Sequence, residues 1–254
     1  MFSDADVERF VAEGFLQLPG AVPEAVTEAC RAQLWQASGC APEDPSTWTR
    51  PVVRVGGLSG APFREAANTG VLRAAYDRLA GEGRWQAPQG LGTFPLRFPS
   101  SEDPGDAGWH LDAGCSDAGG GYRVTLRSHG RALLMLFLFT DVAAADAPTR
   151  IRAGSHRDVA PLLDGFSELP GREWFDLCGA AVEASAHRPV VDAVGRAGDV
   201  FLCHPFLVHT AQPHRGTAPR FIAQPPLEPT APLDLDASVP TPVERAVQEA
   251  LAQA

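Results

Sequence analysis

Short apolar or alternating runs, separated by Gly, Pro and Asp, follow one another from about residue 91 to about residue 225. Each run has the length of a strand, and few stretches between them are long enough for the helical crossovers that parallel strands require. The pattern therefore predicts an antiparallel barrel or double sheet. The expected strands cover residues 91–98, 108–112, 122–128, 131–142, 149–153, 199–203, 206–209 and 219–225.

The first third of the chain is predicted to be mostly helical. Residues 3–6 (Ser-Asp-Ala-Asp) resemble a capping box and open a short helix that Gly14 closes. Farther along, Ser155 is a candidate cap for helical fragments in 155–180, and residues 241–244 (Thr-Pro-Val-Glu) form a second capping box. The remaining expectations are a strand at 15–18, a helix at 23–38, a loop at 40–62 and a helix from Asn68 or Thr69 to Gly81.

These elements predict a single domain of 254 residues, a length common for β-sandwiches and barrels. Its helical N-terminal part covers about 1–90, its β core about 91–225 and its C-terminal helix about 241–253. The expected fold class is thus mainly β with flanking helices.

Charge and composition restrict the partners. The net charge is −10 and every basic residue is arginine, which argues against a nucleic acid or an anionic membrane as partner and excludes a lysine Schiff base. Residues 1–6 are acidic, unlike the basic start of a signal peptide, and no run approaches the ~18 apolar residues of a membrane span. Five scattered cysteines without a Cys-x-x-Cys pair indicate reduced thiols, so a cytoplasmic protein is expected.

One segment, Gly108-Trp109-His110-Leu111-Asp112, carries a histidine and a carboxylate two residues apart. On a strand such residues project to the same side and can supply two ligands to one metal ion. A His-x-Asp pair alone is weak evidence, because a solvated strand face is its usual explanation.

A second segment raises the weight of the first. Residues 198–210 end in His209 and Thr210, and Arg220 follows eleven residues after His209. Two histidines and one carboxylate form the facial triad of non-haem iron oxygenases, which leaves coordination positions open. An arginine on the next strand suits a dicarboxylate cosubstrate, because its guanidinium fork binds a carboxylate through two hydrogen bonds.

Over roughly residues 91–225 the chain resembles the phytanoyl-CoA dioxygenase (PhyH-like) family of iron(II)/2-oxoglutarate-dependent oxygenases, in its bacterial branch. Trp109-His110-Leu111-Asp112 is similar to the family's Trp-His-x-Asp, and Gly198-Asp199 followed by His209 and Arg220 is similar to its Gly-Asp…His…Arg order. Residues 146–156, ending in Gly154-Ser155-His156, resemble its Asn-Gly…Pro-Gly-Ser-His element, with Asp, Ala and Ala replacing Asn, Gly and Pro.

The resemblance implies a double-stranded β-helix (jelly-roll) core and the use of Fe(II), 2-oxoglutarate and O2. His110, Asp112 and His209 would be the metal ligands and the catalytic centre, and Arg220 would anchor 2-oxoglutarate. Some relatives carry a hydroxyl side chain two residues after the distal histidine, where this chain has Ala211. Thr149 or Thr210 would have to replace that hydroxyl, or nothing does.

The function expected from this resemblance is hydroxylation of a small metabolite or natural-product intermediate. Epimerisation, cyclisation, desaturation and halogenation at the same centre are alternatives within the family's chemistry. A binding or sensor module without turnover, and a zinc enzyme with the same three ligands, are alternatives from other classes.

Other histidines compete with the proposed ligands. His204 lies five residues before His209, and this odd spacing turns it to the opposite strand face, so a structural role is predicted. His156 is expected to support a loop near the site, and His214 is expected to be exposed in a polar turn.

A local excess of arginine suggests an anionic substrate. Residues 122–157 carry six arginines against two aspartates in a chain of net charge −10. A solvated outer sheet face is the plainer interpretation, and an electropositive wall that receives an anionic substrate is the sharper one. The candidate substrate residues are Arg123, Arg127, Arg150 and Arg152, with Trp109 as either a pocket wall or a plug of the barrel.

Overall fold

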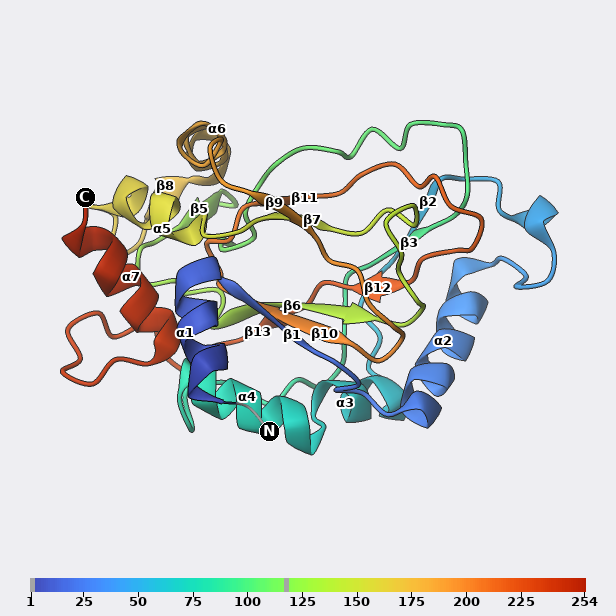
Figure 1. Ribbon diagram of the computed structural model, residues 1–254, viewed down its shortest axis with the longest axis horizontal. Helices are drawn as coiled ribbons and strands as arrows, with labels where there is room; N and C mark the ends of the chain where they lie inside the picture. Colours follow the sequence, from blue (N-terminus) through green and yellow to red (C-terminus); the bar gives the residue numbers. More distant parts are fainter. Residues whose placement is uncertain (1–2, 117–118) are drawn as a thin grey trace.

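A central antiparallel sheet dominates the computed structural model, which describes residues 3–116 and 119–254 (Figure 1). Its strands are hydrogen-bonded in the order β1-β10-β6-β12, and β13 also pairs with β6. The strands are β1 (Phe15–Leu18), β6 (Leu133–Leu138), β10 (Val200–Cys203), β12 (Ile222–Ala223) and β13 (Pro226–Leu227).

Strand β6 is apolar at every position because both faces of the central sheet are covered. Leu133, Met135 and Phe137 belong to one hydrophobic cluster, whereas Leu134 and Leu136 belong to a second cluster on the opposite face. Side chains alternate along a strand, so an uninterrupted apolar run is what a strand between two layers requires.

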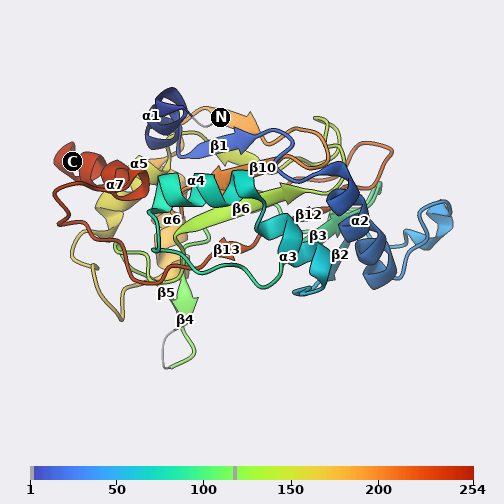
Figure 2. The same ribbon diagram turned by 90° about the horizontal axis from the view of Figure 1, so that it is seen from below.

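Helices cover one face of the central sheet and a smaller sheet covers the other (Figures 1 and 2). The helical layer contains α3 (Ala61–Ala67) and α4 (Gly70–Ala80), and the small sheet has the order β11-β7-β9. The strands of that sheet are β11 (His209–Thr210), β7 (Arg150–Arg152) and β9 (Val190–Asp192). The protein is therefore a mixed α/β structure with antiparallel sheets.

Two further strand groups complete the fold. β2 (Val52–Val55) pairs with β3 (Phe94–Arg97), and a single bridge between Arg97 and Arg220 connects β3 to the β12 edge of the central sheet. A second group, β4-β5-β8, contains β4 (Cys115–Ser116), β5 (Tyr122–Val124) and β8 (Arg172–Glu173). Helix α6 (Trp174–Ala184) follows directly after β8.

The capping signals in the sequence identify the helix ends well. Both predicted capping boxes form, at α1 (Asp4–Glu13) and α7 (Pro242–Ala252), and Gly14 ends α1 with a φ of 82°. Thr69, rather than Asn68, caps α4, and α2 (Glu24–Ser38) ends at Gly39. Ser155 precedes α5 (His156–Val159) but does not cap it, because its hydroxyl accepts a hydrogen bond from the Val208 amide instead.

Three expectations about secondary structure are wrong, one of them the strand at 206–209, of which only His209 lies in a strand. Residues 40–62, predicted as a loop, contain the 3-10 turn η1 (Pro45–Thr47), strand β2 and the start of α3, since pairing with β3 overrides the local Pro and Gly content. Residues 108–112, predicted as a strand, make only one bridge, at His110. A second 3-10 turn, η2 (Ala160–Leu163), follows α5.

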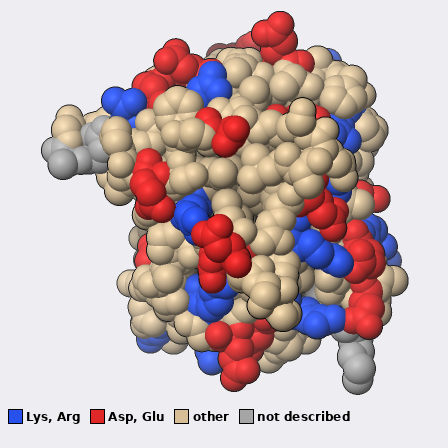
Figure 3. Space-filling model, turned by 90° about the vertical axis from the view of Figure 1, so that its left-hand side faces the viewer, with Lys and Arg blue, Asp and Glu red and all other residues tan. Residues whose placement is uncertain are grey.

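Acidic and basic groups are interspersed on the face that carries α7, with no extended patch of one sign (Figure 3). Ion pairs account for part of this pattern, among them Arg245 with Glu8 and Arg157 with Glu249. Within the described residues, no helix has both the length and the apolar character needed to cross a membrane.

Candidate metal centre

His110 and His209 come from segments about 100 residues apart and are joined directly through their backbones. The amide of each donates to the carbonyl of the other, with N–O distances of 2.9 Å in both directions. The imidazole rings lie side by side, with their centroids 4.5 Å apart. Backbone pairing therefore sets the spacing of these two rings.

Both rings present the nitrogen that a metal would use. Nδ1 of His110 lies 2.6 Å from the Gly108 carbonyl, and Nδ1 of His209 lies 3.0 Å from the Leu207 carbonyl. A carbonyl only accepts, so each Nδ1 carries the proton and each Nε2 keeps a free lone pair. Nε2 of His209 is buried and has no hydrogen-bond partner in the described part of the chain.

Asp112 completes the cluster. Oδ2 of Asp112 lies 3.5 Å from Nε2 of His209, and one ligand atom from each of the three residues falls within 4.8 Å of the others. Two imidazoles and a carboxylate at this spacing match the donor set of a mononuclear iron site with open positions. The orphaned Nε2 of His209 is the observation that a metal ion would explain.

The electrostatics of the cluster favour metal binding at neutral pH. Burial lowers the pKa of His110, and the neighbouring His209 lowers it further, so the imidazole stays neutral. Burial would raise the pKa of Asp112, but His209, Arg131 and His110 together hold it well below its usual range. A neutral imidazole and an ionised carboxylate are the forms that coordinate metal.

Next to the histidines lies a small cavity of about 160 Å³. Arg97 and Arg220 line it, and each side chain is only 1% exposed. Side chains two residues apart on a strand project to the same face. Pro95 and Arg97 therefore line the cavity together, as do Arg220, Ile222 and Gln224. The remaining lining residues are Arg54, Asp106, His110, Thr149, His209 and Ala211.

Arg220 is held in the wall by carbonyl groups. Its guanidinium donates to the carbonyls of Ala147 and Pro95, the latter at 3.2 Å, and its Nε has no partner among the described residues. Burial lowers the pKa of Arg220 well below its ordinary value, and the charge of Arg97 adds to the effect. A buried cation with an unsatisfied N–H is a suitable contact for an anion.

The model of the phytanoyl-CoA dioxygenase family matches residues 10–222. The chain belongs to this family. Among curated proteins, none matches its sequence.

Several solved structures also have a fold similar to that of this chain. The epimerase SnoN, in complex with Fe3+, alpha ketoglutarate and nogalamycin RO, is 17% identical with a TM-score of 0.57, over 87% of this chain and 81% of SnoN. HygX from Streptomyces hygroscopicus, with nickel, 2-oxoglutarate and hygromycin B bound, is 18% identical with a TM-score of 0.55, over 87% and 85%. The carbocyclase SnoK from nogalamycin biosynthesis is 17% identical with a TM-score of 0.54, over 87% and 82%.

The two threonines that could replace the missing hydroxyl of this family member lie differently. Thr149 is 5% exposed and lines the small cavity. Thr210 follows His209 on β11, and its hydroxyl donates to the Ala211 carbonyl. Because alternate residues of β11 face the cavity, His209 and Ala211 line it and Thr210 points away.

The four arginines predicted to meet the substrate do not line the cavity as the described residues define it. Arg150 and Arg152 alternate with Thr149 and Ile151 on β7 and so face the other side, where both lie over the ring of Trp109. The Cζ atom of Arg152 is 4.4 Å from that ring centroid, so the Trp109 ring packs against these arginines.

The other two arginines lie elsewhere. Arg127 pairs with Asp236 at 2.6 Å and with Glu168 at 3.3 Å. Arg123 lies on β5, opposite Glu173 of β8. The exposed carboxylate partners of Arg127 agree with the plainer interpretation, a solvated outer sheet face.

Several residues near the cluster carried no strong signal in the sequence. Trp174 of α6 donates from Nε1 to the carbonyl of Leu111 at 2.8 Å, and Leu111 lies between the ligands His110 and Asp112 in the sequence. The Trp174 ring lies 6.4 Å from the ring of His110. Arg97 is a single arginine in the otherwise apolar strand β3, and that contrast could have revealed it. Asp106 pairs with Arg97 at 2.7 Å and precedes His110 by four residues.

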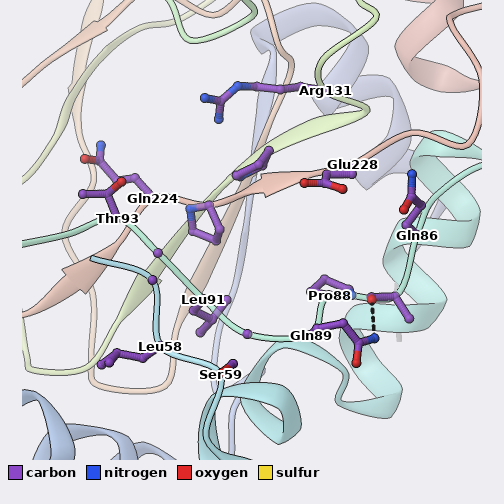
Figure 4. A pocket seen from close by; sticks show the side chains of 16 residues that line it. Leu58, Ser59, Gln86, Pro88, Gln89, Leu91, Thr93, Arg131, Gln224 and Glu228 are labelled. Atoms are coloured by element: carbon purple, nitrogen blue, oxygen red, sulfur yellow. Dashed lines mark hydrogen bonds between the residues drawn. The ribbon is translucent and has the colours of Figure 1, made fainter. Parts of the chain in front are cut away.

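A larger cavity of about 560 Å³ adjoins the small one, since Gln224 lines both. Its wall is built from residues 57–59, 86–93 and 224–226 together with Glu228 and Arg131. Figure 4 shows the Arg131 guanidinium and the Gln224 amide toward one end, and Gln86 and Gln89 toward the other. The Nη1 atom of Arg131 is buried and has no hydrogen-bond partner within the described chain.

The remaining histidines are structural or lie apart from the cluster. His204 is fully buried, with Nδ1 accepting from the Phe206 amide at 3.1 Å and Nε2 beside the Val243 carbonyl at 3.3 Å. His156 donates to the Val11 carbonyl and packs 4.8 Å from His204. The expectation that His214 is exposed is wrong: it is 5% exposed and contacts the Ala218 carbonyl.

Proposed function

We propose that this protein is an iron(II)- and 2-oxoglutarate-dependent oxygenase of a small molecule, with a double-stranded β-helix core in one domain. The observation that carries the proposal is the cluster of His110, Asp112 and His209, whose Nε2 and carboxylate oxygens converge beside a cavity with a buried arginine. Family membership supports it, and the ligand-bound SnoN and HygX structures share the fold.

His110, Asp112 and His209 would hold the metal, and a set of three protein ligands leaves coordination positions for a cosubstrate. Arg220 takes the distal carboxylate of 2-oxoglutarate, and Thr149 offers a hydroxyl in the same cavity. When bound, iron with 2-oxoglutarate and O2 would supply the oxidant that breaks a substrate C–H bond, with 2-oxoglutarate itself oxidised to succinate.

The two cavities suit two molecules of different size. The smaller, at about 160 Å³, has room for about five water molecules at ~30 Å³ each, which fits a small dicarboxylate. The larger, at about 560 Å³, falls in the range of pockets for drug-sized ligands. We assign 2-oxoglutarate to the first cavity and the primary substrate to the second.

The substrate we propose is a small metabolite or natural-product intermediate with an anionic group. Arg131 is the only cation among the residues lining the larger cavity in the described chain, and its charge reaches the metal ligand Asp112. Hydroxylation is the outcome proposed first. Epimerisation and cyclisation stay as alternatives, since the similar folds of SnoN and SnoK belong to an epimerase and a carbocyclase.

The test is oxygen-dependent succinate formation. The purified chain is loaded with Fe(II) under anaerobic conditions, mixed with 2-oxoglutarate and exposed to O2 without a primary substrate. We expect slow succinate formation that needs iron and is lost in Asp112→Ala. A protein that binds iron and 2-oxoglutarate but forms no succinate, with or without a metabolite library, would be a binding module. Activity with Zn(II) alone would indicate a zinc enzyme.

A further inference from the structure

Arg97 and Arg220 lie directly opposite each other on neighbouring strands. The Arg97 amide donates to the Arg220 carbonyl at 2.9 Å, and the Arg220 amide donates back at 2.8 Å. Residues opposed in this way project to the same face of a sheet. Both side chains therefore enter the small cavity, and both line it.

The packing behind the pair fixes this orientation. Phe98 and Phe221, the next residues along each strand, turn to the other face, where their rings lie 5.9 Å apart and contact Trp35. Both rings are fully buried in the main hydrophobic cluster. A flip of either strand would bury a guanidinium among these aromatic rings, so the two arginines have no alternative face.

The charges of this pair are not balanced within the cavity wall. Arg97 has one carboxylate partner, Asp106, which also binds Arg54 at 2.6 Å. In the described part of the chain, Arg220 has only carbonyl partners. Three buried nitrogen atoms, Nε and Nη1 of Arg97 and Nε of Arg220, have no acceptor among residues 3–116 and 119–254. Unpaired buried donors and charge are costly, and an anion in the cavity would satisfy both.

We propose that Arg97 is a second anchor for 2-oxoglutarate, holding the distal carboxylate together with Arg220. This inference rests on the proposed function. One of the two unpartnered Arg97 nitrogens, Nε or Nη1, would donate to the carboxylate while Nη2 stays paired with Asp106, and Arg220 would donate from Nε. A site with two guanidinium groups selects a 2-oxo acid with a carboxylate at its far end.

The experiment compares two ligands that differ only at that end. Calorimetric titration of the Fe(II)-loaded protein under anaerobic conditions measures the Kd of 2-oxoglutarate and of 2-oxopentanoate, which has the same carbon chain without the distal carboxylate. In Arg97→Gln, 2-oxoglutarate should bind at least about 10-fold more weakly, as for the loss of a charged hydrogen bond. The Kd of 2-oxopentanoate should change less than about 3-fold.

Arg157→Gln is the control. It removes an arginine that pairs with Glu249 at 3.2 Å, away from the residues described as lining the small cavity, so its effect on 2-oxoglutarate should stay below about 3-fold. If Arg97→Gln does not fold, Arg97→Lys keeps the pairing with Asp106 and should still weaken 2-oxoglutarate more than about 3-fold, because ammonium lacks the fork.

Three results would overturn the proposal. Unchanged 2-oxoglutarate affinity in both Arg97 variants would remove Arg97 from the site. An equal loss of affinity for 2-oxoglutarate and 2-oxopentanoate would mean that Arg97 supports the metal site or the fold and does not contact the distal carboxylate. A loss of 2-oxoglutarate affinity in Arg157→Gln as large as in Arg97→Gln would indicate a general charge effect. Failure of the wild-type protein to bind 2-oxoglutarate at all would instead contradict the proposed function itself.

Discussion

Nε2 of His209 lies 3.5 Å from Oδ2 of Asp112, with no hydrogen bond between them and with the histidine 2% exposed. A buried lone pair that faces a half-buried carboxylate is unfavourable unless a cation lies between them. This contact distinguishes His209 from the equally buried His204, whose two ring nitrogens both have backbone partners.

Replacing His110, Asp112 or His209 by Ala should therefore weaken Fe(II) binding at least about 100-fold, since each removes one of three protein ligands. Anaerobic titration followed by metal analysis measures the loss. His204→Gln is the control, because it should lower stability while retaining the metal. Loss of iron in His204→Gln together with its retention in His209→Ala would show that the wrong histidine has been assigned.

Arg220→Ala should raise the Kd of 2-oxoglutarate at least about 100-fold, because it removes a charged partner from a buried site. Arg220→Lys should recover only part of the affinity. Arg157→Gln, which removes a surface arginine paired with Glu249, serves as the comparison and should bind normally. An unchanged 2-oxoglutarate dependence in Arg220→Ala would contradict the assignment.

Arg131→Gln should raise the KM of any substrate that stimulates succinate formation about 10-fold or more, while the Kd of 2-oxoglutarate measured without substrate changes little. The reason is that Arg131 lines the larger cavity and is absent from the lining of the smaller one. A substrate whose KM is the same in Arg131→Gln and wild type would show that it does not use this charge.

Stability should fall when the pH drops below about 6.5, the ordinary pKa of histidine. Burial lowers the pKa of His204 to about 3 and that of His156 well below its ordinary value. At a pH between the pKa of a histidine in the folded protein and its pKa in the unfolded chain, the unfolded chain binds a proton that the folded protein does not bind. The full stability is therefore present above pH 6.5 and is lost as the pH falls. At pH 5 His204 should cost about 2 kcal/mol, and His156 should add to the loss.

Urea unfolding at pH 7.5 and pH 5.0 tests this pH dependence. His204→Gln should be less stable than wild type at pH 7.5, yet its free energy of unfolding should fall by about 2 kcal/mol less on acidification. Equal falls in both proteins would mean that His204 does not contribute to the acid sensitivity.

Local signals were reliable where a short segment determines its own structure. The capping boxes before α1 and α7, the stop at Gly14 and the apolar run of β6 each follow from residues within a few positions. Period-two alternation also indicated that His110 and Asp112 share a side, although only His110 pairs as a strand residue.

The features that could not be predicted from the sequence depend on pairing between distant segments. β2 forms only because β3 lies beside it, and Arg97 reaches the cavity because residue 97 pairs with residue 220. The local excess of positive charge predicts that Arg150 and Arg152 contact the substrate. The register of β7 instead turns both side chains toward Trp109. Strand register reverses the direction of every side chain when it shifts by one residue, and local composition does not encode it.

The reciprocal backbone hydrogen bonds between His110 and His209 have a consequence for how the protein acquires its metal. The spacing of two ligands is set by the fold, so the ion need not assemble them, and removing it with a chelator should leave the protein folded. Such a preassembled site ranks divalent ions mainly by their intrinsic affinity for nitrogen and oxygen donors, and copper and nickel exceed iron in that order. Occupancy by iron then depends on the supply of free metal ions around the protein.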